Sequence, residues 1–203
     1  MSFHSEREDG RGERAGRRNE REDGREDGRE DGHARKVAAV AEQLKELSSR
    51  TAGRQEGRRG DDAERRGAEA AGEGAALSLR KGSVPHLVPD PRDPRYSGPK
   101  IDIGALNRVL EIDEREMTCT AESAVTFADL VTETLEKGLA PIVVPELKGI
   151  TVGGAVSGCS IESMSYRHGG FHDTCLEYEI VTGDGRILEC SREQNPEIFE
   201  MIH

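Results

Sequence analysis

The chain has 203 residues, of which 33% are hydrophobic and 34% charged, and its net charge is −11. This acidic balance argues against nucleic acid as the main partner, because such a partner requires a basic face. No apolar run approaches the roughly 18–20 residues that span a membrane, and the charged N-terminus does not resemble a signal peptide. The four cysteines are widely spaced, which favours reduced thiols in a cytoplasmic protein over a disulfide framework or a metal site.

The N-terminal third is rich in charge and glycine. In residues 1–32 the tetrapeptide Arg-Glu-Asp-Gly occurs once and then three times in tandem. Mixed charges with regular glycine cannot offset their ordering entropy by burial, so this low-complexity segment is predicted to be disordered. Apolar residues then recur at helical spacing over 33–47, which predicts an amphipathic helix. The Gly- and Arg-rich residues 48–76 are expected to form a flexible linker.

A folded domain is expected over residues 77–203. "ALSLRKGS" begins with strand-like alternation, and "KIDIGAL" and "MTCTAES" alternate again. Between them, the proline-punctuated "VPDPRDPRYSGPK" excludes a helix or a central strand.

Clear helix and hairpin signals follow. "TFADLVTETLEKG" predicts a helix with Thr126 as N-cap and Asp129 in the place of the capping-box acid. "LAPIVVPEL" predicts a short apolar strand that ends in a turn. "LEYEIVT" and "RILECS" are predicted to pair as strands through the turn at 183–185, and Asn195-Pro196 predicts the start of a last helix. This order of elements predicts an α+β domain.

The glycine-rich stretch "ITVGGAVSGCSIES", residues 150–163, allows close approach of the backbone to a partner. Its glycine spacing does not match the Gly-x-Gly-x-x-Gly dinucleotide fingerprint. The P-loop spacing is present, but Cys159 stands where that motif needs lysine. A Gly-x-Ser-x-Gly nucleophile elbow is absent.

"TVGGAV" after a proline turn resembles the flavin-binding segment of the FAD-linked oxidase family, the fold shared by vanillyl-alcohol oxidase and p-cresol methylhydroxylase. The longer run from "VPELKGITVGGAV" to "RILECS" resembles the Δ24-sterol reductase branch, as do "LSLRKGS" and "KIDIGALNRVLEID" upstream. The resemblance covers about residues 77–203. It implies a PCMH-type FAD-binding domain of two small α+β subdomains. Family members continue past this point, so a C-terminally truncated, incomplete domain without its substrate domain is expected.

The resemblance also implies the cofactor and its contacts. Gly153 and Gly154 would offer main-chain N–H groups to the FAD pyrophosphate. "RKGSVPH" departs from the Gly-Gly-His pattern of covalent attachment, so His86 is a weak candidate and noncovalent FAD is expected. His168 and His172 are expected to be neighbours of a glycine loop, and no catalytic residue is assigned. The expected cofactor-binding residues are Arg80, Lys81, Gly82, Ser83, Pro145, Glu146, Leu147, Thr151, Val152, Gly153, Gly154, Ala155, Gly158, Cys159, Ser160, Ile161, Glu162 and Ser163.

The function that this resemblance implies is an FAD-dependent oxidoreductase that moves a hydride through flavin N5. The reductase branch would use NAD(P)H to saturate a C=C bond, whereas the oxidase branches would oxidise an alcohol. A small-molecule substrate would bind the missing C-terminal domain, so this chain alone is expected to be inactive. The alternative is a non-catalytic flavin-binding or interaction module whose charged tail makes the functional contacts.

Overall fold

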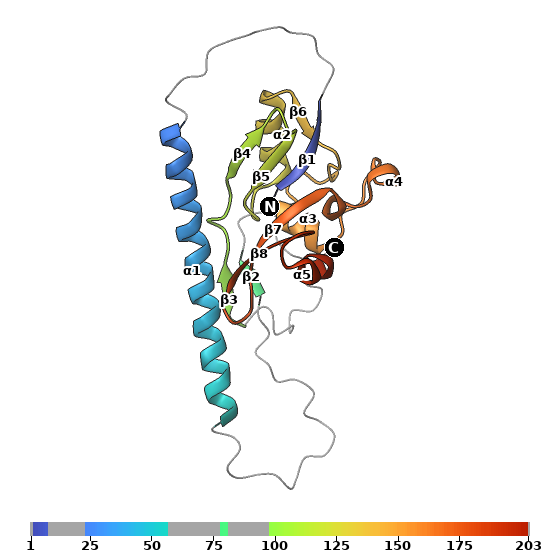
Figure 1. Cartoon of the computed structure of the whole chain (residues 1–203). Helices are drawn as coiled ribbons and strands as arrows, with labels where there is room; N and C mark the ends of the chain where they lie inside the picture. Colours follow the sequence, from blue (N-terminus) through green and yellow to red (C-terminus); the bar gives the residue numbers. More distant parts are fainter. Residues whose placement is uncertain (1, 8–22, 57–77, 81–97, 203) are drawn as a thin grey trace.

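An antiparallel sheet forms the centre of the fold (Figure 1). The computed structural model describes residues 2–7, 23–56, 78–80 and 98–202. The strand order is β4-β5-β1-β7-β8, with β6 pairing to β1. The bounds are β1 Ser2–Arg7, β4 Val109–Asp113, β5 Thr118–Ala121, β6 Leu139–Pro141, β7 Cys175–Val181 and β8 Ile187–Ser191. A separate parallel pair consists of β2 (Ser78–Arg80) and β3 (Lys100–Asp102).

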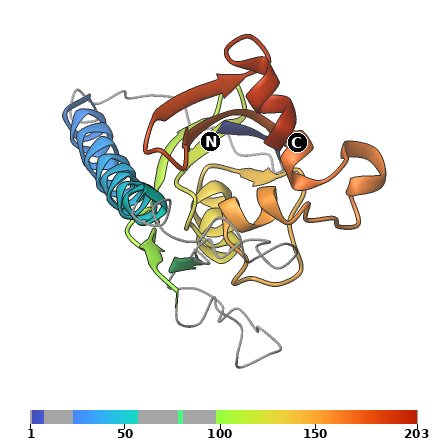
Figure 2. The same ribbon diagram turned by 90° about the horizontal axis from the view of Figure 1, so that it is seen from below.

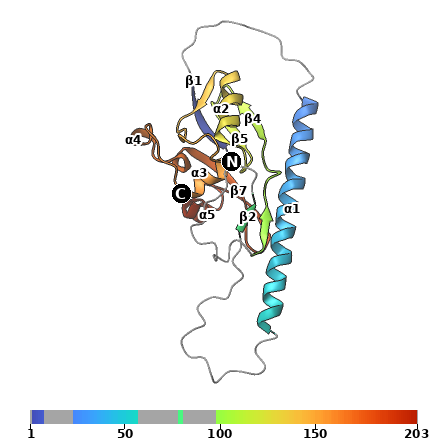
Figure 3. The same cartoon turned by 180° about the vertical axis from the view of Figure 1, so that it is seen from behind.

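Helices of very different length surround these strands. The bounds are α1 Asp23–Glu56, α2 Phe127–Glu136, α3 Val152–Ser157, α4 Ser165–His168 and α5 Pro196–Ile202, with a 3-10 turn, η1, at Phe171–Thr174. In every view α1 runs along one side of the domain and α4 projects from the opposite side (Figures 1, 2 and 3). None of the helices in the described part of the chain is long and apolar enough to cross a membrane.

Most elements predicted for the folded region are present, which confirms the α+β class. Thr126 caps α2 as expected: its Oγ1 accepts a hydrogen bond from the Asp129 amide at 3.2 Å and donates one to Asp129 Oδ2 at 2.6 Å. The strands β7 and β8 pair antiparallel across the predicted Gly-Asp-Gly turn, where Gly185 adopts φ +79°.

The N-terminal region differs from the sequence expectation within the residues that the structure describes. Helix α1 extends beyond the predicted 33–47 at both ends, and it includes residues 23–32 of the repeats and 48–56 of the expected linker. Once a helix is nucleated, each further residue adds a hydrogen bond, and Arg and Glu, which are good helix formers, offset part of the cost of Gly24, Gly28 and Gly32. Strand β1 was not expected either, because its sequence lacks a strand-like pattern. Residues 8–22 and 57–77 lie outside the described part.

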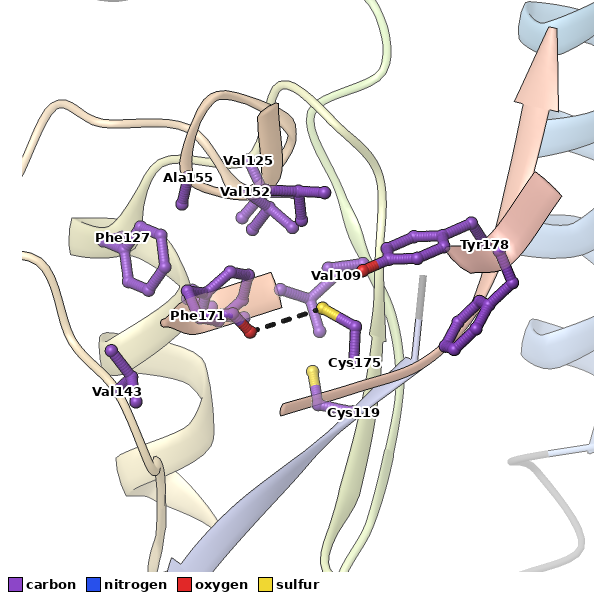
Figure 4. Close-up of a cluster of buried hydrophobic side chains, with 14 of the residues drawn as sticks. Val109, Cys119, Val125, Phe127, Val143, Val152, Ala155, Phe171, Cys175 and Tyr178 are labelled. Atoms are coloured by element: carbon purple, nitrogen blue, oxygen red, sulfur yellow. Dashed lines mark hydrogen bonds between the residues drawn. The ribbon is translucent and has the colours of Figure 1, made fainter. Parts of the chain in front are cut away.

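The main core lies between the sheet and helices α2, α3 and α5 (Figure 4). Phe127 and Phe171 meet edge to face, with ring centroids 4.9 Å apart. Val125 and Val152 pack together beside them, so the loop before α2 and the first turn of α3 share this core. Phe199 from α5 packs on Tyr178 of β7, with centroids 5.3 Å apart.

A second, smaller core joins α1 to the domain. Its buried members are Val37 and Val40 of α1 with Ile101 and Leu106. The amphipathic segment predicted within 33–47 therefore lies against β3 and the connection that follows it. Burial of these apolar side chains, each contributing about 1.5–3 kcal/mol, holds the helix in place.

The β7–β8 turn also touches α1, at Gly185. A Cβ atom on this glycine would lie 2.6 Å from the Ala41 carbonyl oxygen and 2.4 Å from Lys45 Cγ. The replacement Gly185→Val is therefore expected to lower the free energy of unfolding by about 2 kcal/mol, from strain at positive φ and from the clash with α1. Gly183→Val is the matched control, since a Cβ there has no neighbour within 4 Å. Urea denaturation of both variants checks this, and equal midpoints would contradict the contact.

Candidate functional site

The glycine-rich segment forms the short helix α3 and the turn before it. Thr151 is its N-cap: Oγ1 accepts a hydrogen bond from the Gly154 amide at 3.2 Å. Thr151, Val152 and Ala155 are buried, so one side of the segment faces the main core. At the C-terminal end of α3, residues 157–159 are exposed.

The two central glycines, which are predicted to offer their N–H groups to the pyrophosphate, use these amides within the protein. The Gly153 amide donates to the Ser123 carbonyl oxygen at 2.8 Å, and the Gly154 amide donates to Thr151 Oγ1. A Cβ on Gly153 would lie 3.0 Å from both Cβ and O of Ser123. The small residue at 153 thus permits close packing of two backbone segments. The role of both glycines in cofactor binding stays a prediction.

Two loops that are distant in sequence meet beside α3. The Glu146 amide donates to the Glu162 side chain, Oε1, at 2.8 Å, which links the Pro-Glu-Leu turn to the Ile-Glu-Ser run. The Glu162 amide in turn donates to Ser165 Oγ at 2.9 Å. Two large apolar side chains of these loops stay open to solvent: Leu147 is 64% exposed and Ile161 is 73% exposed. The structure therefore unites two of the segments predicted to line the cofactor.

The remaining predicted site residues lie in three places. Pro145 is buried, Ser160 is half-buried, and Gly158, Cys159 and Ser163 are exposed along the same loops. Arg80 lies on β2, in the other sheet, where its guanidinium is 3.9 Å from the Asp102 carboxylate across the strand pair. Lys81, Gly82, Ser83 and His86 lie outside the described residues.

The His-Gly-Gly loop is held by its own neighbours. Gly169 has φ +78°, and the Gly170 amide donates to Asp173 Oδ2 at 2.7 Å. The Phe171 amide donates to the Ser160 carbonyl oxygen at 2.9 Å, so this loop also supports the end of the glycine-rich segment. His172 Nε2 lies 3.4 Å from Asp173 Oδ2. Within the described residues, no cluster of His, Cys, Asp and Glu is suited to hold a metal ion.

All four cysteines are free thiols, but their surroundings differ. Cys119, Cys175 and Cys190 are buried, and desolvation raises the pKa of Cys119 to about 12 and that of Cys175 to about 11. Cys159 is exposed and has φ +49°, because it lies just past the C-cap of α3 at Gly158.

Thiol labelling should therefore distinguish one cysteine from three. We expect a thiol reagent at neutral pH to modify Cys159 in the native protein, since thiolates react and buried thiols with a raised pKa are inert. Mass spectrometry of tryptic peptides gives the site, and Cys159→Ser is expected to remove the reaction. In guanidinium chloride all four should react. Rapid native labelling of Cys119 or Cys175 would contradict the burial described above.

Sequence reasoning missed the residues that support α3 from behind. Ser123 carries the carbonyl that binds Gly153, and the neighbouring Glu122 has a fully buried carboxylate. In the sequence, "TAESAV" is typical of a strand end, where glutamate and serine face solvent. No local pattern indicated otherwise, because the partners of Glu122 lie on α1, far away along the chain.

Comparison with known proteins identifies the domain. The FAD binding domain family matches residues 75–191, which is more than half of the chain. The chain belongs to this family. FAD is therefore its cofactor, as the resemblance implied, and the FAD-linked oxidoreductase relationship is confirmed.

Individual relatives agree with the family. The Δ24-sterol reductase homolog dhcr-24 of Caenorhabditis elegans is 32% identical over 157 residues, covering 76% of this chain and 26% of the relative. The human Δ24-sterol reductase is 33% identical over 94 residues, covering 46% of this chain and 18% of the relative. Cytokinin dehydrogenase 2 of Arabidopsis thaliana is 38% identical over 73 residues, covering 36% and 15%. The chain thus spans about a quarter or less of the length of these relatives.

Among solved structures, 6-hydroxy-D-nicotine oxidase from Arthrobacter nicotinovorans is similar, with a TM-score of 0.49 and 20% sequence identity. The likeness covers 64% of this chain and 27% of the oxidase.

Proposed function

We propose that this chain is the FAD-binding portion of an oxidoreductase that transfers hydride, in the manner of the Δ24-sterol reductases and FAD-linked oxidases. When bound, FAD supplies hydride transfer at its N5 atom. The proposal includes a small-molecule substrate and, for a reductase, NAD(P)H as donor. It assigns to the residues of this chain the binding and orientation of the cofactor.

One observation supports this proposal best: the two linked loops leave Leu147 and Ile161 uncovered next to α3. Exposed apolar side chains on two linked loops beside a glycine-rich turn suit a large planar ring with a polar tail. The residues present therefore fit the cofactor. The Glu146–Glu162 hydrogen bond holds the two loops at a fixed spacing, so the apolar surface is formed in advance of binding.

Because the Gly153 and Gly154 amides already have partners within the protein, this proposal adds phosphate donors from outside the glycine-rich segment. We propose that the segment after β2 supplies them, beginning at Arg80, whose side chain is exposed. Arginine presents several N–H donors in a planar arrangement that matches phosphate oxygens. Its Asp102 partner lies at 3.9 Å, a weak exposed pair that an anionic ligand can displace.

Titration with FAD tests the proposal. The purified chain is expected to quench flavin fluorescence with saturation, and a double change of Leu147→Ser and Ile161→Ser is expected to weaken FAD binding about tenfold or more. Tyr166→Ser is the matched control, because Tyr166 is 84% exposed on α4. A wild-type chain that takes up no FAD overturns the proposal and leaves the interaction-module alternative.

Turnover is a separate measurement. Because the chain spans about a quarter of the length of its C. elegans relative, we expect NAD(P)H oxidation no faster than that of free FAD. Rapid turnover by this chain alone would contradict the proposal that further residues complete the catalytic site.

A further inference from the structure

Glu122 has a buried carboxylate between α1 and the domain. Its side chain is fully inaccessible to solvent. Lys36 Nζ lies 3.0 Å from Oε1 and 2.8 Å from Oε2, and His33 Nδ1 lies 2.9 Å from Oε1. The Arg108 amide donates to Oε2 at 2.8 Å. A buried carboxylate is stable only when its oxygens are fully satisfied, so these partners fix both Glu122 and α1.

The next residue along the chain supports the glycine-rich segment directly. The Ser123 carbonyl accepts the Gly153 amide at 2.8 Å, and the Val125 carbonyl accepts the Val152 amide at 2.9 Å. A Cβ on Gly153 would lie 3.0 Å from the Cβ and O atoms of Ser123, so the two backbone segments approach each other closely here. The position of α3 therefore depends on the main chain of residues 123–125.

That main chain is anchored on the opposite side by Glu122. The Glu122 amide donates to the Arg108 carbonyl at 3.0 Å, and the Ala124 amide donates to the Leu106 carbonyl at 2.7 Å. The Glu122 carboxylate also binds the Arg108 amide. The same side chain therefore links residues 106–108, residues 122–124 and α1. Loss of its charge would weaken the contact to Lys36, and we expect this to loosen both attachments together.

We propose that Glu122 is a positioning residue for FAD: by binding His33 and Lys36 of α1, it holds Ser123 and thereby the glycine-rich segment in the conformation that receives the cofactor. This inference rests on the proposed function. Helix α1 would thus influence the glycine-rich segment through Glu122, without a direct contact among those described.

Hydrogen exchange tests the connection without any cofactor. In Glu122→Gln, which keeps the shape of the side chain, we expect NMR to show at least tenfold faster exchange of the Gly153 amide. The Gly154 amide, bound to Thr151 within the same turn, is expected to change much less. If Glu122→Gln fails to fold, Lys36→Gln provides the same test from α1. Unchanged exchange at Gly153 would overturn the inference, whether or not FAD binds.

FAD affinity provides the second measurement, made at a temperature where every variant is folded. Glu122→Gln and Lys36→Gln are each expected to raise the Kd about tenfold and to combine non-additively, because they break one interaction. Lys36→Arg keeps the cation and is expected to restore affinity to within about twofold.

Gly185→Val is the control for general loosening of α1, because it disturbs the helix at Ala41 and Lys45 without contacting Ser123. Its Kd is expected to match the wild type. An equal loss of affinity in this variant would overturn the role of Glu122, whereas a wild type that fails to bind FAD would refute the proposed function itself.

Discussion

Replacing Phe171 with alanine is expected to lower the free energy of unfolding by about 3–5 kcal/mol, the range for deleting a buried aromatic ring. Phe171 is completely buried and meets Phe127 edge to face at an interplanar angle of 79°. Its carbonyl oxygen also accepts the Cys175 thiol at 3.6 Å, at the start of β7 (Figure 4). The cavity would lie where α2, η1 and β7 meet.

Urea denaturation followed by circular dichroism measures this loss. Phe171→Leu keeps most of the apolar volume and is expected to cost less than half as much. Tyr166→Ala removes an aromatic ring that is 84% exposed and is expected to leave stability within about 0.5 kcal/mol. Similar midpoints for Phe171→Ala and Tyr166→Ala would contradict the described core.

Replacing Lys36 with methionine is expected to cost about 3 kcal/mol, because it leaves a buried carboxylate without its cation. Methionine keeps the apolar stem of the side chain, so the loss reports on the ammonium group. Lys45→Met is the matched control: Lys45 pairs with Glu42 at 2.7 Å, but both side chains are more than half exposed. Exposed pairs of this kind contribute about 0–1 kcal/mol.

The cost of Lys36→Met should also depend on pH. Burial alone would raise the pKa of Glu122, but the hydrogen bonds from Lys36 and His33 and the Arg108 amide outweigh it, and the pKa is lowered. The folded protein therefore keeps this carboxylate ionised at pH values where the unfolded chain is protonated. The stabilisation is complete above the ordinary glutamate pKa of 4.5 and is lost as the pH falls through the lower folded value. Denaturation between pH 3 and pH 7 should show the two proteins converging in acid, and a constant difference would contradict this assignment.

Local patterns in the sequence predicted the elements that depend on nearby residues. The cap at Thr126 and the Gly-Asp-Gly turn are set by side chains within a few positions of one another, and both are confirmed. The cofactor was predictable because the glycine-rich segment and its neighbours together resemble one family, which the match over residues 75–191 confirms.

Long-range contacts were not predictable in this way. The buried state of Glu122 depends on two α1 side chains almost ninety positions away. The direction of the Gly153 amide depends on Ser123, thirty positions away. The local sequence around Glu122 is equally compatible with an exposed strand end, and that around Gly153 with an amide free to bind a ligand. Only the packing of distant segments determines that Glu122 is buried and that the Gly153 amide binds Ser123.

The central place of β1 has a consequence for how the sheet assembles. Residue 3 pairs with residue 119 on one side and with residue 175 on the other, so each partner lies more than half of the chain's length away from β1. Contacts of such high contact order form late, because the entropy of closing a long loop is lost before any pairing is gained. The edges of β5 and β7 that face β1 would therefore be unpaired in a folding intermediate. In that period they form the part of the molecule with the greatest tendency to associate with other strands.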